Sequence, residues 1–121
     1  MILLGTTNSA KQEKLRWLLG GLGLDLITPV GLPSIPDIVE EGPTHLANAE
    51  HKAQEWSRFG ETMAVATDGG LVIPALGDRW ESLNTRGFAG EGVDDRLRVD
   101  QLLQLMEGYT GEGRTAYWIE A

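Results

Sequence analysis

The sequence predicts an α/β (α+β) fold in which helices flank a mixed, twisted sheet, and three observations support this prediction. Short apolar runs typical of strands alternate with longer segments whose apolar residues recur every three to four positions. The length of 121 residues is that of one domain, so we expect residues 1–121 to form a single domain. A hydrophobic content of 41% and a charged content of 23% are near globular averages and argue against a disordered chain.

The first part of the chain predicts a strand, a helix and a second strand. Residues 2–5 form an apolar run typical of a buried strand, and residues 24–30 are the second expected strand. Between them, residues 11–22 place four leucines at helical spacing, and Asn8 or Ser9 is available as the N-cap.

A proline-containing loop and a longer helix follow. Residues 31–43 contain three prolines and are predicted to form an extended loop, and Thr44 suits the N-cap of a helix over residues 44–59. Two stripes run along this helix: an apolar stripe of Leu46, Ala49, Ala53 and Trp56, and a polar stripe of His45, Asn48, Lys52 and Glu55. His45 and His51 do not share a helix face, so we expect both to be exposed and to hold no metal.

The second half of the chain predicts three more strands and one more helix. The expected strands cover residues 63–66, 71–76 and 114–121, and the expected helix covers residues 94–106. Residues 78–92 are rich in glycine and predict irregular structure. Because the sequence stops inside the last strand-like run, we expect a domain that is shortened at its C-terminal side.

Composition excludes several classes of partner. The net charge of −8 argues against non-specific binding to nucleic acid or to an anionic membrane, because both need a positive field. No apolar run approaches the roughly 20 residues that span a membrane. The absence of cysteine excludes disulfides and thiolate metal sites, and it fits a cytoplasmic location.

The first candidate site is the junction between the first strand and the first helix, at Thr6, Asn8 and Lys11. The start of a helix presents free backbone N–H groups and a positive dipole end, which suit phosphate, and Lys11 adds a positive charge. Ordinary capping of the helix by these side chains is the alternative interpretation.

The second candidate site comprises Glu40, Asn48 and Lys52. A carboxylate just before a helix can bind Mg²⁺, which prefers oxygen ligands and shares them with phosphates. Lys52 either points into a cleft or is solvated. Asn48 either orients Lys52 or caps a neighbouring loop.

The third candidate site is Asp68, which is followed by Gly69 and Gly70. A carboxylate at a strand end followed by two glycines indicates that backbone and ligand come close. Because Asp-Gly is also the strongest two-residue hairpin signal, a turn between two strands is the alternative. Arg86, in the glycine-rich segment, either contacts phosphate or lies on the surface.

In order along the chain, these clusters resemble the inosine triphosphate pyrophosphatase family, which hydrolyses deaminated purine nucleotides such as ITP, dITP and XTP. Residues 6–11 resemble the family's Thr-Gly-Asn-x-x-Lys loop, and residues 40–53 resemble its Glu-x-Gly-x-Thr-Phe-x-x-Asn-Ala-x-x-Lys-Ala segment. Residues 67–71 resemble its Asp-Asp-Ser-Gly-Leu element, and residues 84–90 resemble its Ser-Ala-Arg-Tyr-x-Gly segment with one extra residue.

The resemblance implies a Mg²⁺-dependent hydrolase that cleaves a nucleoside triphosphate between the α- and β-phosphates, releasing a monophosphate and pyrophosphate. It implies that Glu40 and Asp68 bind the metal and carry the catalysis. The residues that would bind the substrate are Thr6, Asn8, Lys11, Asn48, Lys52, Gly69 and Arg86.

The sequence departs from the resembled family at several positions. Thr67 stands where the family has the first acid of its pair, Gly69 replaces a serine, and His45 replaces a phenylalanine. The family's later Phe-Gly-Tyr-Asp and Ser-His-Arg segments, which recognise the base, are absent. We therefore expect the N-terminal lobe only. The alternative function is a non-catalytic nucleotide- or phosphate-binding remnant, and in either case we expect a homodimer that covers exposed sheet, with Trp17 as a candidate contact.

Overall fold

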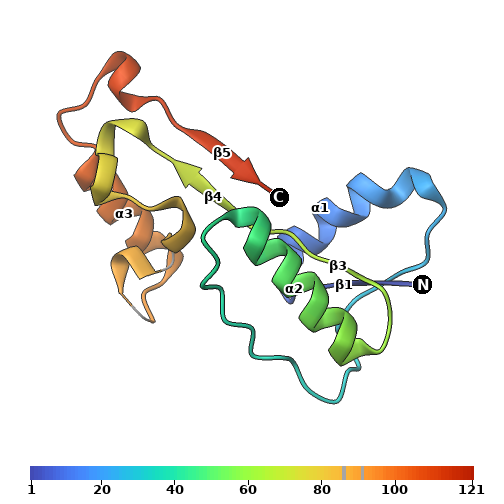
Figure 1. The fold of residues 1–121 in the computed structure, drawn as a ribbon. Coiled ribbons are helices and arrows are strands. Elements are labelled where there is room, and N and C mark those ends of the chain that lie inside the picture. Colours follow the sequence, from blue (N-terminus) through green and yellow to red (C-terminus); the bar gives the residue numbers. More distant parts are fainter. Residues whose placement is uncertain (86, 91) are drawn as a thin grey trace. The chain divides into compact units, whose positions relative to one another are not determined.

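The computed structural model describes residues 1–85, 87–90 and 92–121, which divide into two compact units. The first unit contains residues 1–68 together with Ala121, and the second contains residues 69–120. Strands and helices follow one another along the chain as the α/β class requires, and this class is confirmed (Figure 1). That residues 1–121 form a single domain stays a prediction.

A three-stranded parallel sheet forms the centre of the first unit. Its strands are β1 (Ile2–Leu4), β2 (Leu26–Ile27) and β3 (Ala64–Val65), in the order β2-β1-β3. Leu3 and Leu4 on the central strand are 0% exposed, as expected for a strand with a neighbour on both edges. The predicted strands are present and shorter than their apolar runs.

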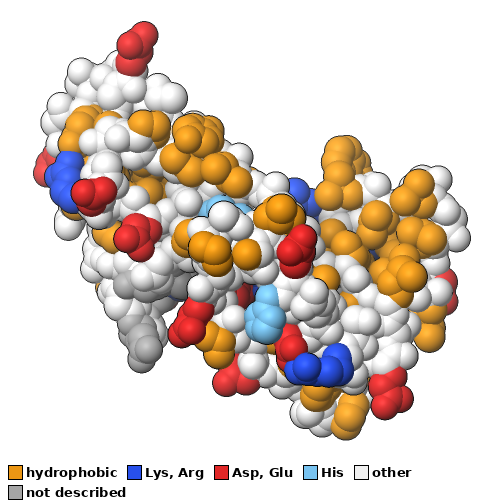
Figure 2. Space-filling view, in the orientation of Figure 1, with side chains coloured by type: hydrophobic (Ala, Val, Ile, Leu, Met, Phe, Trp, Pro, Cys, Tyr) orange, Lys and Arg blue, Asp and Glu red, His pale blue; other side chains and the backbone are white. Residues whose placement is uncertain are grey.

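Helix α1 (Ser9–Leu19) follows β1, and a 3₁₀ turn extends it to Leu22. Asn8 is its N-cap, because the side-chain oxygen of Asn8 accepts a hydrogen bond from the backbone N–H of Lys11 at 3.2 Å. Of the four leucines at helical spacing only Leu15 is buried. Hydrophobic side chains are therefore visible on the surface over α1 (Figure 2).

Helix α2 (His45–Gly60) packs on β1 and β3, and Thr44 caps it by accepting from the backbone N–H of Ala47. Ala49 and Trp56 are buried as predicted, but Leu46 is 58% exposed. The residues buried beside Ala49 and Trp56 come from the polar stripe: His45, Asn48 and Lys52. These polar groups can be buried because they are hydrogen-bonded.

The second unit contains an antiparallel pair of strands, β4 (Gly69–Val72) and β5 (Tyr117–Glu120). Gly69 lies opposite Glu120 in this pair, while β3 pairs with β1 in the other sheet. The hairpin turn considered for Asp68-Gly69 is therefore wrong. The expected strand over residues 71–76 begins earlier and ends at Val72, because a 3₁₀ segment starts at Pro74.

Helix α3 (Asp95–Leu105) belongs to the second unit, and the side chain of Asp94 caps it by accepting from the backbone N–H of Leu97. The core of this unit consists of Ile73, Leu76 and Met106, with partly buried apolar residues packed around them. Further 3₁₀ segments cover Pro74–Arg79, Ser82–Asn84, Gly87–Ala89 and Gly111–Arg114. Among the residues described, no helix is long and apolar enough to cross a membrane.

Gly5, just after β1, marks the tightest packing in the first unit. A Cβ atom at this position would lie 2.8 Å from Cδ1 of Trp56 and 3.1 Å from the backbone oxygen of Val65. Only glycine lets the end of β1 approach α2 and the end of β3 this closely.

We predict that Gly5→Ala lowers the free energy of unfolding by about 1–3 kcal/mol, the usual cost of overpacking a core. Gly20→Ala is the matched control, because a Cβ at Gly20 meets nothing within 4 Å and Gly20 has helical angles, φ −62° and ψ −23°. Urea unfolding of both variants measures the difference. Equal stabilities of the two alanine variants would contradict this account of the packing.

Candidate functional site

A buried lysine on α2 organises the site. Lys52 is 7% exposed, and its Nζ donates a hydrogen bond to Oδ1 of Asp68 at 2.8 Å and forms an ion pair with Oε1 of Glu40 at 3.1 Å. Burial of an unpaired ammonium group is very costly, so these two carboxylates are what allow Lys52 to lie inside. The solvated interpretation of Lys52 is wrong.

Asp68 lies just after β3 and is 6% exposed. Its backbone is fixed by two hydrogen bonds with Ala121: the N–H of Asp68 donates to the Ala121 oxygen at 3.0 Å, and the Asp68 oxygen accepts from the Ala121 N–H at 2.9 Å. Its carboxylate is held at both oxygens, by Lys52 at Oδ1 and by His45 at Oδ2.

His45 is a site residue that the sequence interpretation missed. It is 7% exposed, and its Nδ1 lies 2.6 Å from Oδ2 of Asp68. The expectation of an exposed His45 is wrong, whereas His51 is exposed as predicted. The available signal was the spacing of three and four that puts His45, Asn48 and Lys52 in one stripe on the helix.

Asn48 supports the loop that carries Glu40. It is 2% exposed, and its Oδ1 accepts a hydrogen bond from the backbone N–H of Gly42 at 2.7 Å. A Cβ atom on Gly42 would lie 2.6 Å from this oxygen, so the contact requires glycine. Asn48 thus caps a neighbouring loop, which was one of the two roles considered for it.

The charge of Asp68 is set by opposing effects. Burial by itself raises the pKa of this carboxyl, but the hydrogen bonds from Lys52 and His45 and their charges outweigh burial, so the pKa lies below its usual value. Asp68 is consequently ionised at neutral pH. An ionised carboxylate can accept hydrogen bonds or bind a cation, and it cannot donate a proton.

The loop after β1 lies at the same edge of the sheet as Asp68. β1 and β3 are parallel neighbours, so the segments that follow them leave from their shared carboxyl ends. The chain crosses from β1 to β2 on one side and reaches β3 on the other side of β1, and crevices at such a switch point are the usual ligand sites of α/β sheets.

Within this loop the capping interpretation is correct. The hydroxyl of Thr6 accepts from the backbone N–H of Asn8 at 3.2 Å, and Asn8 in turn caps α1. Binding of phosphate by Thr6, Asn8 and Lys11 stays a prediction, and capping does not conflict with it, because further N–H groups at a helix start can still bind an anion.

Two predicted substrate-binding residues remain, Gly69 and Arg86. Gly69 belongs to β4, where a Cβ would lie 2.8 Å from the backbone oxygen of Ile119, so close strand packing explains this glycine. Arg86 lies outside the described residues. Substrate binding by both stays a prediction.

The carboxylates of the site can be compared with the ligands that usually bind Mg²⁺. Over the residues described, no group of three or more histidines, cysteines or carboxylates gathers to hold a metal. The carboxylates of Glu40 and Asp68 nevertheless converge on one ammonium group, so they lie close enough to share a cation. Mg²⁺ is commonly held by one or two carboxylates together with water and substrate phosphates, and the two carboxylates fit this pattern.

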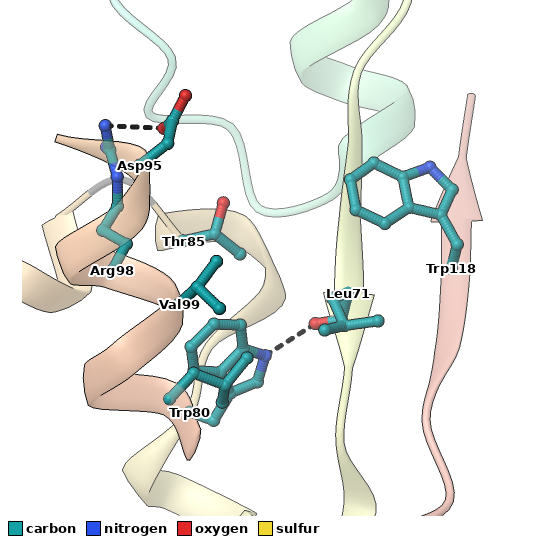
Figure 3. A pocket seen from close by; sticks show the side chains of 8 residues that line it. Leu71, Trp80, Thr85, Asp95, Arg98, Val99 and Trp118 are labelled. Atoms are coloured by element: carbon teal, nitrogen blue, oxygen red, sulfur yellow. Dashed lines mark hydrogen bonds and ion pairs between the residues drawn. The ribbon is translucent and has the colours of Figure 1, made fainter. Parts of the chain in front are cut away.

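A separate cavity of about 370 Å³ lies within the second unit. It is lined mainly by apolar and aromatic side chains, among them Leu71, Trp80 and Trp118 (Figure 3). The indole of Trp80 donates to the backbone oxygen of Leu71 at 2.7 Å, and Arg98 pairs with Asp95 at 3.0 Å on the opposite wall. No sequence motif indicated this cavity, because its residues are widely separated along the chain.

Comparison with known sequences finds one family and relatives that share one name. The sequence pattern that defines the Ham1 family matches residues 2–120. A dITP/XTP pyrophosphatase from Anaeromyxobacter dehalogenans is 34% identical over 142 residues, covering 95% of this chain and 60% of the relative. A dITP/XTP pyrophosphatase from Oceanobacillus iheyensis is 33% identical over 119 residues, covering 98% of this chain and 60% of the relative.

Comparison with solved structures leads to the same group of proteins. A Ham1 protein from Coxiella burnetii matches with a TM-score of 0.79 and 30% identity, covering 98% of this chain and 59% of that one. A dITP/XTP pyrophosphatase from Mycobacterium abscessus matches with a TM-score of 0.70 and 26% identity, covering 98% of this chain and 62% of that one. The chain thus spans about 60% of the length of the proteins it matches.

The lowered pKa of Asp68 predicts how its contribution to stability depends on pH. The folded state prefers the carboxylate, so the stabilisation is complete above the unfolded pKa of about 3.9 and is lost as the pH falls through the lower folded pKa. Urea unfolding of the wild type and Asp68→Asn between pH 7 and pH 2 should therefore show a difference that shrinks in acid. Glu50→Gln, at an exposed position of α2, is the control and should show no such difference. A difference for Asp68→Asn that persists unchanged at pH 2 would contradict the assignment.

Proposed function

Because this chain belongs to the Ham1 family, whose pattern matches residues 2–120, we propose that it catalyses the Mg²⁺-dependent hydrolysis of nucleoside triphosphates. The proposed substrates include deaminated purine nucleotides such as ITP, dITP and XTP, since curated relatives carry the name dITP/XTP pyrophosphatase. The observation that carries the proposal is the buried pair of Lys52 and Asp68, joined by the exposed Glu40, at the carboxyl edge of the parallel sheet.

Lys52 is the proposed phosphate-binding cation of the cluster. Its ammonium group has three N–H donors, and Asp68 and Glu40 accept from two directions. The side chain is largely withdrawn from water, so its attraction to a phosphate oxygen is less screened than that of a surface lysine. The start of α1, with Asn8 and Lys11, would supply further N–H groups and charge for the triphosphate.

Glu40 and Asp68 are the proposed ligands of Mg²⁺. When bound, the metal would neutralise charge on the phosphates and polarise the phosphorus centre that water attacks. In the overall reaction, water adds to the α-phosphorus, the bond from that phosphorus to the bridging oxygen breaks, and pyrophosphate leaves. The lowered pKa of Asp68 favours a role as metal ligand over a role as general base, because a weakly basic carboxylate takes a proton from water poorly.

A non-catalytic nucleotide-binding protein is the second candidate. The observation that favours it is Thr67, which stands where the resembled family has the first acid of its pair. Under both candidates we propose a homodimer, because large apolar side chains such as Trp17, 80% exposed, are left on the surface of the first unit. A cytoplasmic location stays a prediction.

We predict Mg²⁺-dependent release of pyrophosphate from ITP, dITP or XTP, abolished by chelation of the metal and by Asp68→Asn. The measurement is a pyrophosphate assay over these three nucleotides and the four standard ones. Nucleotide binding by calorimetry without turnover would establish the second candidate in place of hydrolysis. Neither binding nor turnover with any nucleotide would refute both.

We also predict that Lys52→Met weakens nucleotide binding at least about tenfold, the loss expected when a charge-assisted hydrogen bond of about 1.5–3 kcal/mol is removed. Lys14→Met, on α1, removes the same charge elsewhere and should leave the dissociation constant within about twofold. Circular dichroism of both variants establishes that they are folded. Equal affinities for the wild type and Lys52→Met would exclude Lys52 from the phosphate site.

A further inference from the structure

We propose that His45 is a positioning residue for Asp68: its Nδ1–H holds Oδ2 of the carboxylate, so that Asp68 keeps its orientation when Lys52 also engages a phosphate. This inference rests on the proposed function, and it adds a residue to the site. The contact that carries it is the 2.6 Å separation between two groups that are both almost completely buried.

The start of α2 fixes the position of the imidazole. His45 is the first residue of the helix, and the preceding Thr44 caps that helix through its bond to the Ala47 N–H. The backbone at position 45 is therefore set by the capping geometry, and the ring is 7% exposed. A ring placed in this way from a rigid element can orient its partner precisely enough for catalysis.

The contact between Asp68 and Lys52 decides the direction of the hydrogen bond from His45. A carboxylate that accepts from the Lys52 ammonium group at Oδ1 is an acceptor at Oδ2 as well, so Nδ1 of His45 carries the proton that it donates. Such a bond, with one ionised partner, is stronger than a bond between neutral groups. The tautomer is thereby assigned by the chemistry of its partner.

The need for a second anchor follows from the position of Lys52. One ammonium group serves Asp68 and Glu40 together, and a bound phosphate would compete for it. A carboxylate held by Lys52 alone could then rotate. Because His45 holds the other oxygen, Asp68 stays fixed, and each of its oxygens still has a lone pair for a metal ion or water.

The experiment compares His45→Phe with His45→Asn. Phenylalanine keeps a ring and removes the donor, whereas the asparagine amide nitrogen can occupy about the position of Nδ1 and donate to Asp68. We expect His45→Phe to lower kcat for ITP by about 10–100-fold, the effect of a displaced catalytic group. We expect His45→Asn to retain kcat within about threefold, and His51→Phe on the exposed face of α2 to match the wild type.

A spectroscopic arm tests the contact without relying on turnover. Long-range ¹H–¹⁵N correlation spectra of the His45 ring should show a protonated Nδ1 at pH 8, and its proton signal should move in Asp68→Asn. An unprotonated Nδ1 would overturn the proposal. Unchanged kcat in His45→Phe, or equal losses in His45→Phe and His45→Asn, would overturn it as well, because the donor would then be irrelevant.

Failure of the proposed function is distinguishable from failure of this inference. If the wild type does not turn over any nucleotide, hydrolysis is refuted, and the same variants are compared by calorimetry for the Mg²⁺-dependent part of ITP binding. A loss of affinity in His45→Phe that His45→Asn restores supports the positioning role. Equal Mg²⁺-dependent binding in the wild type and His45→Phe refutes it.

Discussion

The buried ion pair between Lys52 and Asp68 is the interaction on which the rest of the first unit's polar centre depends. It ties α2 to the segment after β3, and Glu40 and His45 each reach one member of the pair. Removal of one partner from a buried pair typically costs about 3–5 kcal/mol, because the other charge is left uncompensated. The cluster is therefore at once a structural element and the group of side chains with the chemistry for phosphate and metal.

Local sequence signals were sufficient to predict where the helices lie in the chain. They were insufficient to predict which side chains of a helix are buried. The caps at Asn8 and Thr44 lie where capping chemistry predicts, and α2 was predicted to within one residue at each end. Hydrophobicity, however, put Leu46 in the apolar stripe of the helix and favoured an exposed His45, whereas Leu46 is exposed and His45 is buried. Polar residues that satisfy one another can be buried, and their partner Asp68 is distant in sequence, so the helix alone does not contain this information.

Strand pairing depended on contacts that no local pattern specifies. Asp-Gly at 68–69 carries a hairpin signal, yet Gly69 pairs with Glu120, which is far along the chain. The resemblance in sequence order did predict that Glu40, Lys52 and Asp68 belong to one site, and the structure brings these three side chains together. The contribution of His45 could not be inferred in this way, since it depends on the geometry at the start of α2.

The double hydrogen bond between the backbones of Asp68 and Ala121 has a practical consequence for spectroscopy. Because the sequence contains no cysteine, a single cysteine introduced at position 121 would be the sole thiol available for labelling. A fluorophore attached there would be carried by backbone that is hydrogen-bonded to the residue at the centre of the charge cluster. Its emission would be sensitive to the arrival of a highly charged ligand, which gives an optical probe of occupancy that is independent of any chemical step.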